Sequence, residues 1–168
     1  MAYGNQVKTD ALSTVYDSEV YPLGSTFVQS PDENNAANST HYGEKTWVFV
    51  FNDEASTAWA EGDLISIDTG DYAPYHGIVS AAAATVAGSI LGAAGHAVAA
   101  GKYGWVVQRG VCECKGDGSV SQGDAIVSHT SGQVDTMGSG EEVGIIGVAL
   151  EDDGSAGDLF TCKIAIPA

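Results

Sequence analysis

The fold of this chain is decided by one stretch, Gly101-Lys102-Tyr103-Gly104-Trp105-Val106-Val107-Gln108-Arg109-Gly110. Tyr103, Trp105 and Val107 recur at every second residue, which in an extended backbone places the three side chains on one face. The glycines at both ends of the stretch favour breaks in the strand. The pattern therefore predicts a core strand.

Five further runs have β-branched or alternating apolar residues: Thr46 to Phe51, Asp63 to Asp68, Gly123 to His129, Glu142 to Leu150 and Phe160 to Ile166. Within the fourth run, Val143 to Leu150 is expected to be a buried strand whose glycines allow close approach of another backbone. Gly-Asp precedes an apolar run at both Gly62 and Gly123, which hints at two related β units. These patterns predict an all-β fold, either a β-sandwich or a small β-barrel with little helix.

At 168 residues the chain is suited to a single domain, because a compact domain of this size buries roughly 70% of its unfolded surface. We assign that domain to residues 21–168 and expect residues 1–20 to form an extended N-terminal arm. Isolated apolar residues in the arm are candidate contacts with a partner or with a second subunit; they are Val7, Leu12, Val15, Tyr16 and Val20.

Two segments have less decisive patterns. Ser30 to Gly43 is polar and contains Pro31, which predicts an exposed loop, and no helix is required anywhere in the chain. Ile78 to Ala100 is rich in Ala and Gly and is compatible with a membrane span, a helix, or strand-turn-strand. We favour the last, with Thr85 to Leu91 as a strand and a turn at Gly92 to Gly95.

The net charge and the first ten residues indicate which partners and which site of synthesis to expect. Twenty-two acidic residues against six basic ones give a net charge of −16, which opposes binding to nucleic acid. The polar start, Met1 to Asp10, lacks the pattern of a secretory signal, so synthesis in a cytosol is expected. No membrane partner is predicted either.

No motif for catalysis or cofactor binding is recognisable, and the chain is expected not to be an enzyme. Cys112 and Cys114 share one strand face and could approach a metal ion, but a tetrahedral site needs further ligands, so we interpret them as buried structural thiols. The histidines are scattered, without a neighbouring nucleophile. Two carboxylates that are far apart in the sequence could still meet in the fold and form a hydrolase site. We nevertheless expect no catalytic, cofactor-binding or metal site.

A carbohydrate- or calcium-binding adhesion module is the alternative function. Carboxylates that would favour calcium flank glycines at two places. One place has Asp68 and Asp71, and the other has Asp152, Asp153 and Asp158. Neither has the spacing of an EF-hand loop, and both suit ordinary turns. Aromatic residues of the strands would supply a sugar platform, although core positions are the better interpretation. Trp59, just before a Gly-Asp turn, is the residue we most expect to be exposed, and it joins the candidate contacts.

Several motifs in order carry a resemblance to a known family. They are Tyr21 to Gly24, Glu61 to Leu64, Gly101 to Gln108, Gln122 to Val127, and Ile146 to Asp152 followed by Gly157-Asp158 and a final strand. In this order they resemble the small head decoration, or capsid cement, proteins of tailed bacteriophages. The Ser30 to Gly43 loop, the residues before Tyr21 and the alanine-rich middle depart from that pattern.

The resemblance implies an all-β structural virion protein that is made in the host cytoplasm and acts on the outer capsid surface. Such a protein binds the major capsid protein, often as a homotrimer, and stabilises the shell by bridging neighbouring capsomers. The resemblance does not extend to the oligomer number or to the position on the capsid lattice.

Overall fold

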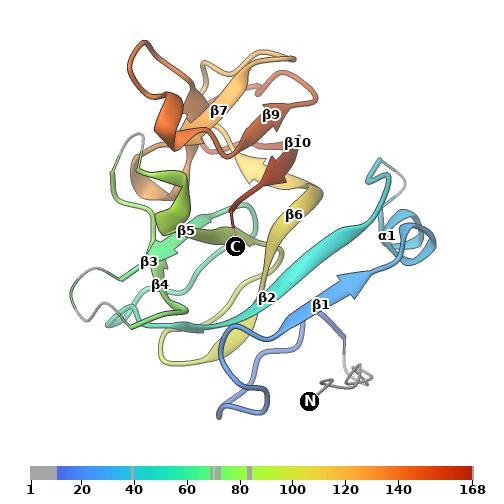
Figure 1. The fold of residues 1–168 in the computed structure, drawn as a ribbon, viewed down its shortest axis with the longest axis vertical. Helices are drawn as coiled ribbons and strands as arrows, with labels where there is room; N and C mark the ends of the chain where they lie inside the picture. The colour runs from blue at the N-terminus through green and yellow to red at the C-terminus, as the bar shows by residue number, and fades with distance from the viewer. Residues whose placement is uncertain (1–10, 39, 69, 71–72, 83–84, 168) are drawn as a thin grey trace.

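The computed structural model describes residues 11–38, 40–68, 70, 73–82 and 85–167. Within these residues the chain forms ten strands and one short helix, which confirms the predicted all-β class (Figure 1). The strands are β1 (Thr26–Gln29), β2 (Lys45–Asn52), β3 (Leu64–Ile67), β4 (His76–Val79), β5 (Ile90–Ala94), β6 (Tyr103–Lys115), β7 (Ala125–Ser128), β8 (Val134–Thr136), β9 (Gly147–Ala149) and β10 (Leu159–Ala165). The helix is α1 (Pro31–Ala37), and 3-10 turns span Ala87–Ser89, Thr130–Gly132 and Glu142–Gly144.

The strands form one sheet that closes on itself in part. Its order is β1-β2-β4-β3-β5-β6-β10-β9-β7-β8, and an additional pairing of β2 with β6 closes the ring β2-β4-β3-β5-β6 into a small barrel. The other strands continue the sheet from β6 through β10, and an isolated bridge between Gly116 and Val134 brings the end of β6 back to β8. In Figure 1, β6 accordingly runs through the middle of the molecule, with β2 beside it and β10 above.

The central strand is the one predicted from Gly101 to Gly110, although it extends five residues beyond that stretch, to Lys115. Trp105 and Val107 are buried in one hydrophobic cluster, and Val106, on the opposite face, is buried in a second cluster with Val48 and Trp59. Tyr103 is half-buried. The strand is apolar on both faces because it separates the interior of the barrel from a second core.

The alanine-rich segment forms strands, but not at the predicted positions. The predicted strand at Thr85 to Leu91 and the predicted turn at Gly92 to Gly95 are wrong, because β5 runs from Ile90 to Ala94 and follows a 3-10 turn. Gly92 lies inside this strand, where a Cβ atom would be 2.5 Å from the carbonyl oxygen of Val107 on β6. Among the described residues no helix is long and apolar enough to cross a membrane.

Replacing Gly92 by alanine is expected to lower the free energy of unfolding by about 2 kcal/mol, because the methyl group would collide with the backbone of β6. Gly88→Ala is the matched control, since a Cβ there meets nothing within 4 Å. Urea unfolding of both variants measures the difference. Equal unfolding midpoints would show that β5 does not pack against β6 as described.

The predicted loop at Ser30 to Gly43 contains α1, which corrects the expectation that no helix is needed. Ser30 caps the helix: its hydroxyl accepts a bond from the backbone N–H of Glu33, and the Glu33 carboxylate accepts one from the N–H of Ser30. Pro31 occupies the first turn, where its missing N–H costs nothing. The buried side chain of Asn34 donates to the carbonyl of Gly43 and closes the segment.

The predicted buried strand from Val143 to Leu150 is shorter than expected. Glu142–Gly144 is a 3-10 turn and the side chain of Val143 is exposed, so the strand is confined to Gly147–Ala149. The carboxylate of Glu141 favours the turn by accepting the N–H of Gly138, and the main-chain carbonyl of the same residue accepts the N–H of Gly144. The close backbone approach expected for a glycine is confirmed at Gly147, where a Cβ would collide with the carbonyl of Lys163.

The repeated Gly-Asp phrase forms the same turn twice. The carboxylate of Asp63 accepts the backbone N–H of Ala60 at 2.6 Å, and that of Asp124 accepts the N–H of Ser121 at 3.0 Å. Each turn leads directly into a strand, β3 or β7. The similarity of the two units thus has a common local cause: the Asp directly before each strand accepts the N–H of the residue three positions earlier.

Candidate functional site

The described half of the N-terminal segment lies against the chain's own barrel. The backbones of Tyr16 and Tyr103 exchange two hydrogen bonds of 3.0 Å, and Lys102 pairs with Asp17 at 2.8 Å. The hydrogen bond from Lys102, together with its charge, lowers the pKa of the exposed Asp17. The ring of Tyr16 packs edge-on against Tyr21 and Phe49. Residues 11–20 are therefore attached to the first residues of β6.

The structure separates the candidate contact residues of this segment into two groups. Leu12 and Tyr16 are half-buried against the core, whereas Val15 is 39% exposed and Val20 is 51% exposed. Val7 lies outside the described residues. Val15 and Val20 are thus the members whose side chains are available to a partner in this structure.

The expectation that Trp59 is exposed is wrong, because its side chain is 0% exposed. Its backbone forms two hydrogen bonds with Val98, which draw the indole into the barrel interior. Trp47 and Trp105 are buried as well, so none of the three tryptophans offers a flat surface to a sugar. The alternation of apolar residues after Trp59 is a signal for burial, whereas the expectation of exposure rested on the Gly-Asp turn that directly follows this residue.

An open strip crosses the sheet on the outside of β1, β2, β6, β10 and β9. Register pairs place its members side by side: Val28 opposite Thr46, Thr46 opposite Arg109, Arg109 opposite Ala165, and Lys163 opposite Val148. All six are exposed or half-buried, and none is acidic. In a chain with 22 acidic residues, this strip has a distinct composition.

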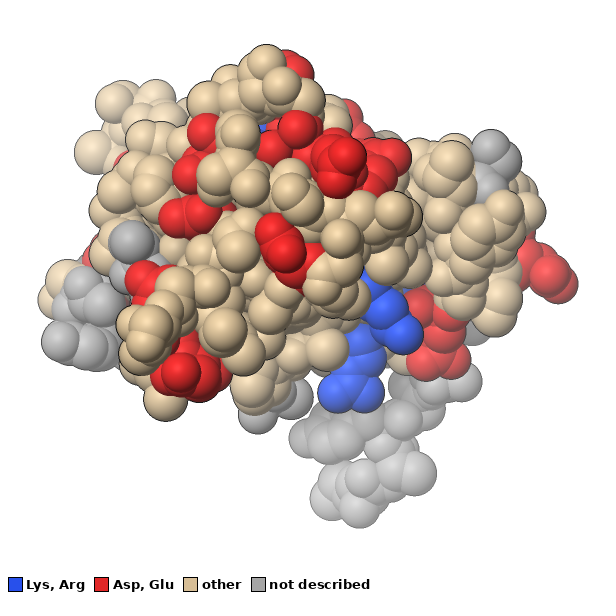
Figure 2. Space-filling model, turned by 90° about the horizontal axis from the view of Figure 1, so that it is seen from above, with Lys and Arg blue, Asp and Glu red and all other residues tan. Residues whose placement is uncertain are grey.

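The open strip also holds cations that have no acidic partner among the described residues. Lys102 pairs with Asp17 and Lys115 with Asp63, whereas the exposed Arg109 and Lys163 have no such ion pair. Figure 2 shows that on one face Asp and Glu are widespread, whereas Lys and Arg are few and most of their visible surface lies in one small patch. A surface of this kind is electrostatically complementary to an acidic partner.

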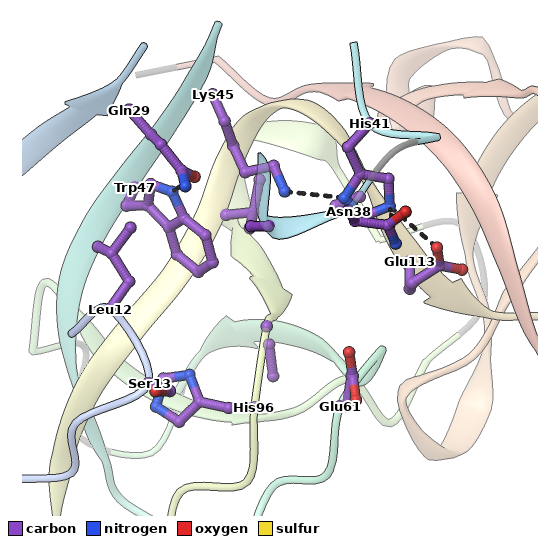
Figure 3. Close-up of a pocket in the computed structure, with 15 residues that line it drawn as sticks. Leu12, Ser13, Gln29, Asn38, His41, Lys45, Trp47, Glu61, His96 and Glu113 are labelled. Carbon is purple, nitrogen blue, oxygen red and sulfur yellow. Dashed lines mark hydrogen bonds and ion pairs between the residues drawn. The ribbon is translucent and has the colours of Figure 1, made fainter. Parts of the chain in front are cut away.

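A pocket of about 390 Å³ lies between the N-terminal segment, the end of α1, and strands β2 and β6. Figure 3 shows Lys45 and His41 directed toward each other on one side, with Ser13, His96 and Glu61 across the cavity. Its lining is mixed, and includes Leu12, Gln29, Asn38, Trp47, Glu113 and Cys112. The sequence gives no sign of this pocket, because its walls come from segments far apart in the chain.

Three polar side chains form a line along the pocket. The ammonium of Lys45 donates to Nδ1 of His41 at 3.2 Å, and Nε2 of His41 donates to Glu113 at 2.9 Å. An ammonium group can only donate, so the imidazole carries its proton on Nε2. Burial lowers the pKa of Lys45, and negative charge on Cys112 and Glu113 opposes that shift. Lys45 is thus a buried cation whose partner is a neutral imidazole.

Of the carboxylates considered for calcium, Asp68 stabilises its own turn, as the sequence interpretation had it, by accepting the N–H of Gly70 at 2.7 Å. Asp152 and Asp153 instead bind distant segments, because they accept the N–H groups of Gln122 and Gly118, each at 2.7 Å. Asp71 lies outside the described residues. Among the described residues, ligand-type atoms converge instead in two other groups, Cys112 with Cys114 and Cys162, and Asp117 with His129 and Asp135.

The cysteines are buried as predicted, but the third joins the other two. Cys162 lies on β10 directly opposite Cys112, so the two strands bring all three sulfur atoms together. Hydrogen bonds from the other two thiols lower the pKa of Cys112, and burial raises that of Cys162. No spacing rule could have identified Cys162, because it is 48 residues from Cys114.

Comparison with known proteins gives a fold but no family. No protein-family model matches this chain, and no curated protein matches it. Among solved structures, it is similar to the N base of the head fiber gp8.5 in bacteriophage phi29, with a TM-score of 0.53 and 16% identity. The match covers 71% of this chain and 92% of that one. At this identity the likeness shows a shared fold.

Proposed function

We propose that this chain is a structural protein of a tailed-phage virion that decorates the outside of the capsid and stabilises it by bridging capsomers. The observation that carries the proposal is the fold shared with the base of a phage head fiber, over 92% of that chain. The ordered motifs of the sequence, which resemble capsid cement proteins, support the same class independently. The major capsid protein is the proposed partner.

The open strip is the surface we assign to the capsid. Arg109 and Lys163 would meet carboxylates of the major capsid protein, while Val28 and Val148 add apolar area beside them. The remaining acidic surface faces solvent and is repelled by packaged DNA. Val15 and Val20 remain candidate contacts with the capsid or with a sister copy in a homotrimer.

Binding energy alone suffices for this role. A protein that binds only the assembled shell stabilises it by mass action, by about 2.7 kcal/mol per site at a concentration of 100 times Kd. A trimer that spans several capsomers gains further from avidity. We propose no reaction; in the pocket, the two nitrogens of His41 are bonded to Lys45 and Glu113.

Addition of the purified chain to empty expanded capsids of its phage is expected to give co-sedimentation and a higher capsid melting temperature. Sedimentation equilibrium of the free chain measures the oligomer, with a trimer expected. Failure to bind capsids would refute the decoration role. A monomer that still binds them would refute only the homotrimer.

The adhesion-module alternative keeps one observation in its favour. Asp117 and Asp135 bring two carboxylates together that suit calcium, although the imidazole of His129 beside them does not, and the buried tryptophans remove the sugar platform. A melting temperature that rises with added calcium would favour this alternative. The decoration role predicts no calcium dependence.

A further inference from the structure

The three thiols of the core form a compact cluster. Cys112 and Cys114 lie two residues apart on β6 and face the same core, and Cys162 faces them from β10. Their sulfur atoms all lie within 4.8 Å of one another, with Cys112 to Cys162 at 4.0 Å and Cys114 to Cys162 at 2.7 Å. All three are buried on two paired strands, so their positions are held by the backbone ladder.

The spacing of the sulfur atoms is close to that of a metal centre. Three thiolates bound tetrahedrally at about 2.3 Å from one ion would lie about 3.8 Å apart. The Cys112–Cys162 distance agrees with this value, and the Cys114–Cys162 pair would have to open by about 1 Å, through rotation of the two side chains. Thiolate ligands select soft or borderline ions such as zinc over calcium or magnesium.

The surroundings supply charge compensation and access. Zinc with three thiolates carries one net negative charge, which a single nearby cation would offset. Lys45 is such a cation: it is buried, its partner is a neutral imidazole, and it lines the same pocket as Cys112. Cys112 is 3% exposed and lines that pocket, so the pocket is the side from which a water molecule would reach the cluster as the fourth ligand.

We propose that Cys112, Cys114 and Cys162 bind one zinc ion, which links β6 to β10 in the core. The site goes beyond the capsid-decoration role and does not depend on it. Zinc binding displaces the thiol protons and forms three sulfur–zinc bonds without any change of oxidation state. The rival structure is a disulfide between two of the three thiols.

The test starts with the unaltered protein, purified under reducing conditions without chelator. We expect one zinc per chain by elemental analysis, a melting temperature that falls with chelator and recovers with zinc, and an intense near-ultraviolet thiolate-to-cobalt absorption when cobalt replaces zinc. Absence of zinc together with absence of the cobalt band would overturn the proposal. So would mass spectrometry showing two of the three thiols joined in a disulfide in the native protein.

A pair of variants assigns the site. Cys114→Ser is expected to abolish the cobalt band and the zinc-dependent rise in melting temperature. Asp135→Asn, in the other group of converging ligand atoms, is the matched control and is expected to keep both. Loss of the band in Asp135→Asn with its retention in Cys114→Ser would place the metal at the Asp117 group and refute the thiol site. The result for the unaltered protein stands even if Cys114→Ser does not fold.

Discussion

Trp105→Ala is expected to lower the free energy of unfolding by about 3–5 kcal/mol, the usual cost of removing a buried aromatic ring. Trp105 is 2% exposed and packs against Phe49, with ring centroids 5.1 Å apart, and against Tyr21 at 5.4 Å. Its loss would leave a cavity between the N-terminal segment and the central strand. Since domains typically have about 5–15 kcal/mol of stability, this substitution would remove a large part of it.

Urea unfolding followed by circular dichroism measures this effect. Tyr42→Ala is the aromatic control, because Tyr42 is 71% exposed and its removal is expected to change stability by no more than about 0.5 kcal/mol. If Trp105→Ala kept its unfolding midpoint but lost capsid binding, Trp105 would be a contact residue and its assignment to the core would be wrong.

The second large effect is expected on binding. Arg109→Ala combined with Lys163→Ala is expected to weaken capsid binding at least tenfold, or about 1.4 kcal/mol, with little change in stability. Both side chains are exposed and have no ion pair with a described residue, so their charges are available to a partner rather than to the fold. Co-sedimentation with empty capsids at several salt concentrations measures the loss, and the salt dependence should decrease with it.

A control of equal net charge separates a local from a general effect. The double alanine variant has a net charge of −18, two units below the natural −16. Ser56→Glu with Ser139→Glu also gives −18, at exposed positions outside the open strip. If both variants lost affinity equally, total charge would explain the binding and the open strip would not be the contact surface.

The elements that were predictable from sequence share one property: their own residues decide them. Strands β2, β6, β7 and β10 are rich in β-branched or aromatic residues, which favour strand over helix. Helix α1 was equally readable, because Ser30, Pro31 and Glu33 form a capping box with proline in the first turn. The polar composition of the surrounding loop obscured it.

The position of β5 and the burial of Trp59 could not be read from local pattern. Alanine and glycine are compatible with strand, turn and helix, so the neighbouring backbone of β6 decides which residues of that segment pair. Trp59 follows polar residues, and its burial depends on a bridge to Val98, 39 residues later along the chain. Contacts of such sequence separation leave no periodic signal.

The stretch from Gly101 to Gly110 by itself determined that a buried strand lies at the centre of an all-β protein, because alternation and strand geometry have the same period. The sites that β6 helps to form depend on the strands that pair with it. The register of β10 against β6 places Cys162 opposite Cys112 and sets Lys163 diagonally beside Arg109, and so forms both the thiol cluster and the open strip. Only the tertiary structure decides that register, since the pairing of two strands is chosen by how their faces pack together.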